Sequence, residues 1–220
     1  MKKTILAVIG AALTIGFIGC NMFGGAQSPY YPLKVGNKWE YETKITTTIG
    51  TADPTDTTFK YESEVISETK LTGKEKLAVW EVKNTVGKNA TTKYVRVDKD
   101  WVYTYEKLAD EKESYKWPNS PKVGDKWTMT TIKDKDTSIV NYEIVADKKT
   151  ANEYKDCLKV KVTSKAAEKM YKEYENYMYW APNVGNVLNT VKAVMETVVG
   201  TDTTRTTMDT ETKLVKYTKG

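Results

Sequence analysis

The sequence predicts an all-β fold of mainly antiparallel strands. Apolar and charged residues alternate without interruption in residues 39–45 and 158–162, as expected of strands that have one face on a core and the other in water. Glycine, asparagine and aspartate mark turns between such runs at hairpin spacing, and the fifteen tyrosines suit a half-buried pleated surface. We therefore expect about 11–13 strands in a half-barrel or sandwich-like sheet.

The elements follow in chain order. Alternation predicts strands within residues 39–45, 59–61, 101–105, 158–162, 174–180 and 187–195. Turns are expected at 71–74, 86–89, 98–100, 134–136 and 199–202. One segment competes with this pattern, because Ala167, Met170, Tyr171 and Tyr174 have the spacing of a helix face. Residues 165–174 are therefore expected to form the one short helix.

A short motif occurs twice. Lys34-Val-Gly-Asn-Lys-Trp39 returns as Lys122-Val-Gly-Asp-Lys-Trp127, with a proline shortly before each copy. A turn that leads into a strand places the tryptophan as the first inward residue, so we expect Trp39 and Trp127 to be buried in equivalent positions. Residues 30–220 form either a single β domain or two duplicated halves, 30–117 and 118–220, and both interpretations stay open.

Composition excludes several chemistries. The chain has no histidine, which removes histidine-based nucleophile activation and histidine-ligated metal sites. Arginine occurs only at positions 96 and 205 and the charges are interspersed, so nucleic-acid binding is not expected. No calcium-loop arrangement is present, and pairs such as Asp98 and Asp100 fit turns. We expect no metal, no cofactor and no catalytic set.

A dense group of aromatic residues offers the candidate ligand-facing side chains: Tyr174, Tyr177, Tyr179 and Trp180. Such rings can form a platform for sugars or line a pocket for an acyl chain, but cross-strand pairing that stabilises the sheet is the favoured explanation. Cys157 precedes the 158–162 strand, where alternation places its thiol on the more polar face. We nevertheless expect a neighbouring strand or loop to shield it, with no catalytic role.

The first twenty residues carry the strongest motif. Lys2 and Lys3 precede an apolar run that ends in Phe17-Ile18-Gly19-Cys20, which is typical of a secretory signal. The cysteine at this junction resembles the lipobox of bacterial lipoproteins, with Phe17 where that family usually has leucine. The resemblance implies removal of residues 1–19, lipidation of Cys20, including a palmitate-like acyl group, and a flexible tether over residues 20–29.

A second resemblance concerns residues 31–41 and 179–187, with their PLKVGNxW and YWAPxVGxV segments. They are similar to a loosely defined group of secreted β-rich bacterial proteins of unknown function. Together the two resemblances imply a lipid-anchored protein of the cell envelope, at the outer membrane, with a non-enzymatic binding or structural role. The alternatives are a carrier of lipid or acyl chains resembling LolA and LolB, and a glycan-binding surface module.

Overall fold

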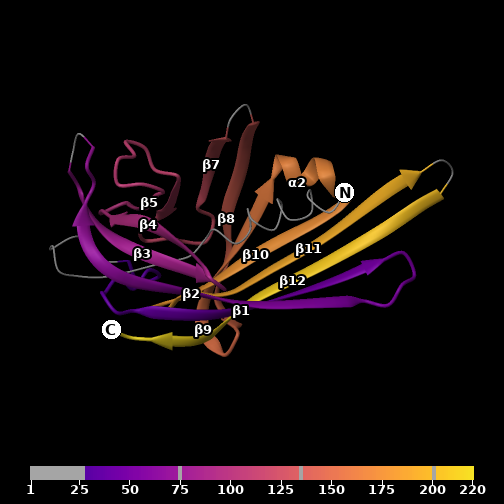
Figure 1. The fold of residues 1–220 in the computed structure, drawn as a ribbon, viewed down its shortest axis with the longest axis horizontal. Helices are drawn as coiled ribbons and strands as arrows, with labels where there is room; N and C mark the ends of the chain where they lie inside the picture. Colours follow the sequence, from indigo (N-terminus) through magenta and orange to yellow (C-terminus); the bar gives the residue numbers. More distant parts are fainter. Residues whose placement is uncertain (1–27, 74–75, 134–135, 200–201) are drawn as a thin grey trace.

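All strands of the described chain belong to one antiparallel sheet (Figure 1). The structure is a computed structural model and describes residues 28–73, 76–133, 136–199 and 202–220. The elements are β1 (Lys38–Ile49), β2 (Thr55–Lys70), β3 (Ala78–Val86), β4 (Asn89–Val97), β5 (Trp101–Tyr105), β6 (Tyr115–Pro118), β7 (Lys126–Lys133), β8 (Asp136–Ala151), β9 (Tyr154–Ser164), α2 (Lys165–Met170), β10 (Glu173–Ala181), β11 (Gly185–Val199) and β12 (Asp202–Thr218).

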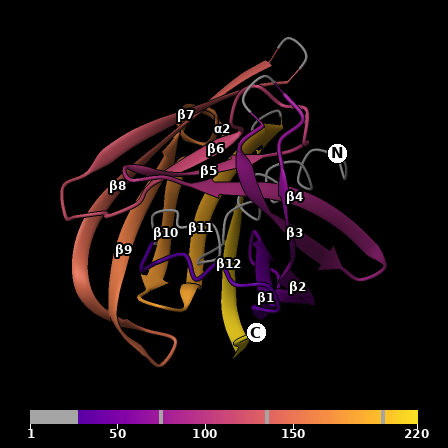
Figure 2. The ribbon, with the colours of Figure 1, turned by 90° about the vertical axis from the view of Figure 1, so that its left-hand side faces the viewer.

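The sheet consists of two meanders, β1–β6 and β7–β12, which are joined because β1 pairs with β12. Its twelve strands lie in the order β6-β5-β4-β3-β2-β1-β12-β11-β10-β9-β8-β7, so β1 pairs with β12 and the edges are β6 and β7. The sheet curls nearly into a closed barrel, and Figure 2 shows β5 and β6 coming round toward β7 and β8. The all-β prediction is confirmed. The fold is one curved sheet, so the sandwich alternative does not apply.

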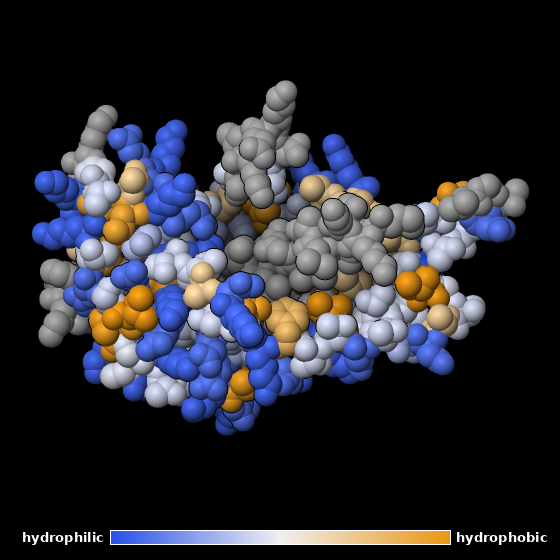
Figure 3. All heavy atoms as spheres, in the orientation of Figure 1, coloured by the Kyte–Doolittle hydropathy of each residue, from blue (hydrophilic) through white to orange (hydrophobic). Residues whose placement is uncertain are grey.

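The interior face of this sheet carries the core. In β1 the charged residues point outward and alternate with the buried side chains of Trp39, Tyr41, Thr43 and Ile45. Outward residues form cross-strand ion pairs such as Lys38 with Glu62 at 2.8 Å, which contribute little stability at an exposed surface. Polar and apolar side chains are interspersed on the face seen in Figure 3. Burial of the interior face therefore holds the sheet together.

Helix α2 is shorter than the spacing predicted. The side chain of Ser164 caps it by accepting from the Ala167 N–H at 3.5 Å, and the helix ends at Met170 rather than at residue 174. The Lys172 N–H donates to the Val194 carbonyl at 2.7 Å, which starts the pairing of β10 with β11. The last residues of the segment with helical spacing, up to residue 174, therefore pair with β11 instead of continuing the helix.

Both copies of the repeated motif form the same turn. Asn37 N–H donates to Lys34 O at 2.9 Å, and Asp125 N–H donates to Lys122 O at 3.0 Å. The glycines of the two copies have φ angles of +90° and +95°, and each donates to the neighbouring strand at 2.8 Å. Trp39 and Trp127 are both buried, as predicted. The duplication of the two halves itself stays a hypothesis.

These turns give the first prediction. Gly36→Ala and Gly124→Ala should each lower the free energy of unfolding by about 1–2 kcal/mol, because alanine is strained at positive φ. Gly36→Ala should cost more, since its Cβ would lie 2.9 Å from the Gly220 Cα, whereas a Cβ at Gly124 meets no atom within 4 Å. Urea unfolding measures both. An unchanged midpoint for Gly124→Ala would contradict the importance of the turn.

Candidate ligand-binding site

Six aromatic side chains form a continuous group on the interior face, called here the aromatic cluster. Tyr31 comes from the segment before β1, and the other members lie on β6, β7, β8 and β10, where the edges of the sheet approach each other. The members are Tyr31, Tyr115, Trp117, Trp127, Tyr142 and Trp180. Trp117 and Trp180 are fully buried, at 0% exposure.

The rings contact one another directly. Trp180 packs against Tyr31 and Trp117, with ring centroids 4.8 Å and 4.7 Å apart. Trp117 meets Trp127 edge to face, at 4.9 Å and 78°. Trp127 in turn stacks on Tyr142 at 5.1 Å. The cluster therefore runs without a break from β10 across both edge strands to β8.

Three indole N–H groups of this cluster have no hydrogen-bond acceptor among the described residues. They belong to Trp117, Trp127 and Trp180, and all three nitrogens are buried. Buried tryptophans elsewhere in the core are bonded, since Trp39 donates to Val184 O at 2.6 Å and Trp80 to Glu68 Oε1 at 3.1 Å. A buried donor without an acceptor costs about 1–3 kcal/mol, so three neighbouring ones need an explanation.

Contacts with neighbouring rings can satisfy only some of these three indole N–H groups. An N–H can point at the face of a neighbouring ring in an edge-to-face pair, and Trp117 with Trp127 is such a pair. Trp180 is tilted by only 30° and 37° from the rings of Tyr31 and Trp117, so its in-plane N–H is not directed at either face. Tyr31 with Trp117 is a second edge-to-face pair, so ring faces are available to the N–H groups of Trp117 and Trp127. The Trp180 N–H still lacks an acceptor within the described part of the chain.

The interior around the cluster carries no ionised partner. The buried polar residues of the described chain are all serine, threonine or asparagine. Burial, together with the neighbouring hydroxyls of Tyr115 and Tyr142, raises the pKa of Tyr31 well above 10.0. The site thus offers hydrogen-bond donors and flat apolar walls, but no charge to neutralise an anion.

The cluster lies beneath the line where the sheet fails to close. We call this line the seam: Tyr115, Lys116 and Trp117 of β6 against Trp127 and Met129 of β7. The Lys116 N–H, which would donate to a strand in a closed sheet, donates to Met129 Sδ at 3.3 Å. Thioether sulfur is a weak acceptor. Across the described residues, β6 and β7 share no backbone hydrogen bond, so the seam is held by side chains and by the loop of residues 119–125 that joins the two strands.

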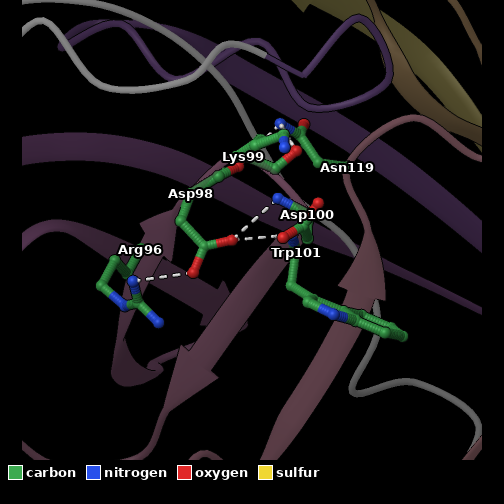
Figure 4. Close-up of polar contacts among 6 residues, drawn as sticks. All are labelled: Arg96, Asp98, Lys99, Asp100, Trp101 and Asn119. Atoms are coloured by element: carbon green, nitrogen blue, oxygen red, sulfur yellow. Dashed lines mark hydrogen bonds and ion pairs between the residues drawn. The ribbon is translucent and has the colours of Figure 1, made fainter.

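The turn between β4 and β5 holds the end of β6 in place (Figure 4). Asp98 Oδ1 accepts from the Trp101 N–H at 2.8 Å and the Asp100 N–H at 3.0 Å, which confirms the turn interpretation of this aspartate. Partial burial opposes ionisation, but these donors and Arg96 lower the pKa of Asp98. Asn119, directly after β6, binds this turn through Asp98 O and Asp100 O, each at 2.8 Å. Strand β6 is therefore anchored to β5.

The four aromatic residues singled out from the sequence do not share one surface. Tyr174 and Trp180 face the interior, whereas Tyr177 and Tyr179 face outward, because they alternate along β10. The outer pair lies beside Lys159, whose Nζ is 3.7 Å from the ring centroid of Tyr177. Their ligand-facing role stays a prediction. No sequence pattern identified Tyr31, Tyr115 and Trp117 as neighbours of Trp180, because they meet only through the curl of the sheet.

The outer face has a shallow groove of about 440 Å³ over β1, β10, β11 and β12. It is lined by alternating cations and acids, including Lys44, Lys192 and Glu175, together with Tyr177. Lys159 covers one face of that tyrosine, which leaves less ring surface for a sugar. The groove is therefore a weaker candidate than the aromatic cluster.

Cys157 is fully buried, which confirms the predicted shielding of its thiol. Its side chain belongs to the core, so the prediction that it lies on the more polar face is wrong. Asp156 has a φ of +57° and the pairing of β8 with β9 is irregular between Lys149 and Ala151, so strict alternation breaks just before the thiol. Burial raises the pKa of Cys157, and Sγ donates to Tyr154 O at 3.4 Å. The buried thiol is thus poorly placed to act as a nucleophile.

The remaining sequence predictions concern residues outside the described ranges, above all Cys20 and the signal over residues 1–19. In the described part, no group of acidic or cysteine side chains has the arrangement of a metal site. No helix there is long and apolar enough to cross a membrane. Comparison with family models, curated proteins and solved structures finds no match to this chain.

The unpaired indole groups give a stability prediction. Trp39→Phe and Trp180→Phe both shrink a fully buried ring, but only Trp39 loses a hydrogen bond. Trp39→Phe should therefore lower the free energy of unfolding by about 1–2 kcal/mol more than Trp180→Phe. Denaturant unfolding of the two variants measures the difference. Equal losses would mean that the Trp180 N–H is satisfied in solution.

The buried tyrosines predict alkaline unfolding. Burial raises the pKa of Tyr31, Tyr41 and Tyr115 well above 10.0 in the folded state. Above that pH the unfolded chain loses these protons while the folded chain keeps them, so stability falls as pH rises. Melting temperatures, measured with tyrosinate absorbance from about pH 8 to 11, should show the last tyrosines ionising only on unfolding. Complete ionisation before unfolding would contradict their burial.

Proposed function

We propose that this protein is a cell-envelope lipoprotein, anchored at the outer membrane through acylated Cys20, that acts by binding and not by catalysis. Its ligand lies against the interior face of the sheet, at the aromatic cluster. The observation that carries the proposal is the group of three buried indole N–H donors without an acceptor among the described residues. A purely structural core loses stability by such a group, whereas a ligand with acceptor oxygens would satisfy it.

A carrier of acyl chains is the second candidate, because the apolar interior continues beyond the aromatic cluster. Ile45, Ala193 and Met208 form a second buried group on β1, β11 and β12, with Phe59, Tyr171 and Tyr174 packed against it. Burial raises the pKa of Tyr142 in the aromatic cluster, and Tyr174 is near enough to raise it further, so the two separate groups line the same interior. An extended apolar lining of this kind suits a long hydrocarbon chain more than a compact ligand.

Native mass spectrometry of the full chain, purified in detergent from bacterial membranes, tests the binding role. We expect a fraction of the protein to carry a small molecule that is released on unfolding. Its mass then distinguishes a lipid from a sugar. Consistent recovery of the protein without any bound molecule, together with no binding of added lipids or sugars, would leave only a structural role.

Anchoring gives a separate prediction. Cys20→Ala should abolish labelling by a radioactive or alkyne fatty acid and prevent stable membrane attachment, since acyl chains contribute about 0.8 kcal/mol per buried methylene. Cys157→Ser is the matched control, because the chain has two cysteines and Cys157 is buried in the fold. It should keep the label. Unchanged labelling of Cys20→Ala would rule out the anchor, and fractionation with the inner membrane would rule out the outer-membrane location.

A further inference from the structure

The two meanders of the sheet, β1–β6 and β7–β12, meet at two joints: the pairing of β1 with β12, and the seam between β6 and β7. The two joints are equivalent in position but differ in their hydrogen bonds. If β1–β6 and β7–β12 are compared in order, β7 takes the place of β1 and β6 takes the place of β12. The joint between β1 and β12 is then matched by the seam. Trp39 stacks on Tyr217 across the first joint at 5.2 Å, and Trp127 meets Trp117 across the second at 4.9 Å. The same position of the motif thus supplies a ring to each joint.

Only the first joint is closed by backbone pairing. The ladder between β1 and β12 extends from Lys38 opposite Thr218 to Ile49 opposite Thr206. At the seam β6 has only four residues, ends in Pro118, which lacks an N–H, and donates from Lys116 to a thioether. Separating β6 from β7 therefore breaks ring contacts and one weak hydrogen bond. Separating any laddered pair breaks a row of backbone hydrogen bonds.

Opening the seam would uncover the unpaired donors. Trp117 and Trp127 stand on opposite sides of it, with their rings in contact, and Trp180 lies directly behind Trp117. Asn119 holds β6 to the turn between β4 and β5, so β6 would move with β5. An opened seam would thus lead directly to the buried indole N–H groups.

The chemistry of the opened seam defines its ligand. Indole N–H groups only donate, so the ligand must supply acceptor oxygens. The buried hydroxyls of Tyr31 and Tyr115 in the same cluster can accept as well as donate, so the ligand can also carry a hydroxyl. The buried polar residues of the described chain carry no charge, which disfavours a carboxylate or phosphate. The aromatic walls, and the second buried apolar group on β1, β11 and β12, favour a hydrocarbon chain. An ester carbonyl on an acyl chain meets all three conditions.

We propose that the seam is the portal through which an uncharged acyl ester enters the interior, where Trp117 and Trp127 donate hydrogen bonds to its ester oxygens. The proposal rests on the binding role proposed above and names the ligand class and its route. It predicts preference for a neutral glyceride over the free fatty acid of the same chain.

Uptake across a locked seam tests the route. Lys116→Cys with Thr128→Cys places one thiol on each side of the seam, on the outer surface, and a short reducible bifunctional thiol reagent joins them. The matched control is Lys44→Cys with Glu211→Cys, two directly opposed positions across the β1–β12 joint. Brominated mono-oleoylglycerol is added to the full chain in detergent, and quenching of tryptophan fluorescence reports its arrival. We expect the seam cross-link to block quenching, reduction to restore it and the control cross-link to change nothing.

Binding of the same probe to Trp→Phe variants tests the contacts. Trp117→Phe and Trp127→Phe keep the apolar ring, and each should weaken binding roughly 3- to 10-fold, the range expected for one hydrogen bond. Trp39→Phe, which loses a bond to the backbone instead, should leave the affinity unchanged. Brominated oleate should bind more weakly than the glyceride. Melting curves of each variant separate loss of binding from loss of folding.

Each outcome decides a different point. Quenching at an unchanged rate through a locked seam overturns the portal. Equal binding by the tryptophan variants, or tighter binding of oleate, overturns the ester contacts or the ligand class, while the binding role stands. If the glyceride does not bind and mass spectrometry finds another bound molecule, this proposal fails and the proposed function survives. If no molecule binds in either experiment, both fail.

Discussion

The backbone ladder between β1 and β12 is the interaction on which the rest of the structure depends. It joins the first and last strands of the chain in the middle of the sheet, from Lys38 opposite Thr218 to Ile49 opposite Thr206. Without it the chain would be two separate meanders, each with two unpaired edges. With it, the right-handed twist of a twelve-stranded sheet brings β6 and β7 toward each other and encloses an interior. The aromatic cluster exists because of that curl, since its members come from β6, β7, β8, β10 and the segment before β1.

The same constraint explains why the site is at the seam. A single ladder fixes one joint and leaves the opposite edges to side chains, so Trp117, Trp127 and Met129 do there what backbone bonds do elsewhere. Rings exclude water without forming directional bonds, which lets the edges close while their indole N–H groups stay unpaired. The weakest line of the sheet and its unsatisfied donors therefore coincide. That coincidence supports a binding role more strongly than either feature alone.

Much of the fold could be predicted from the sequence, because it depends on local pattern. Alternation in residues 39–45 and 158–162 identified true strands, and the repeated motif identified Trp39 and Trp127 as buried. The site could not be found in this way. Tyr31 and Trp180 are far apart in the chain and meet only through the curl, and Trp117 lies in a strand of four residues, which is too short for alternation to identify. Two predictions were wrong for a related reason. An irregularity in the pairing of β8 with β9 changed the face of Cys157, and the pairing of β10 with β11 ended α2 earlier than its helical spacing predicted.

Hydrogen exchange of the backbone amides of the folded protein tests the central claim, that the sheet is closed by a ladder at one joint and by side chains at the other. The amides of β1 and β12 that bond across their joint should exchange only when the whole domain unfolds. The amide of Lys116, bonded to Met129 Sδ, should exchange much faster and through local opening. Protection of Lys116 equal to that of the β1 and β12 amides would show that the seam does not open, and would contradict the account.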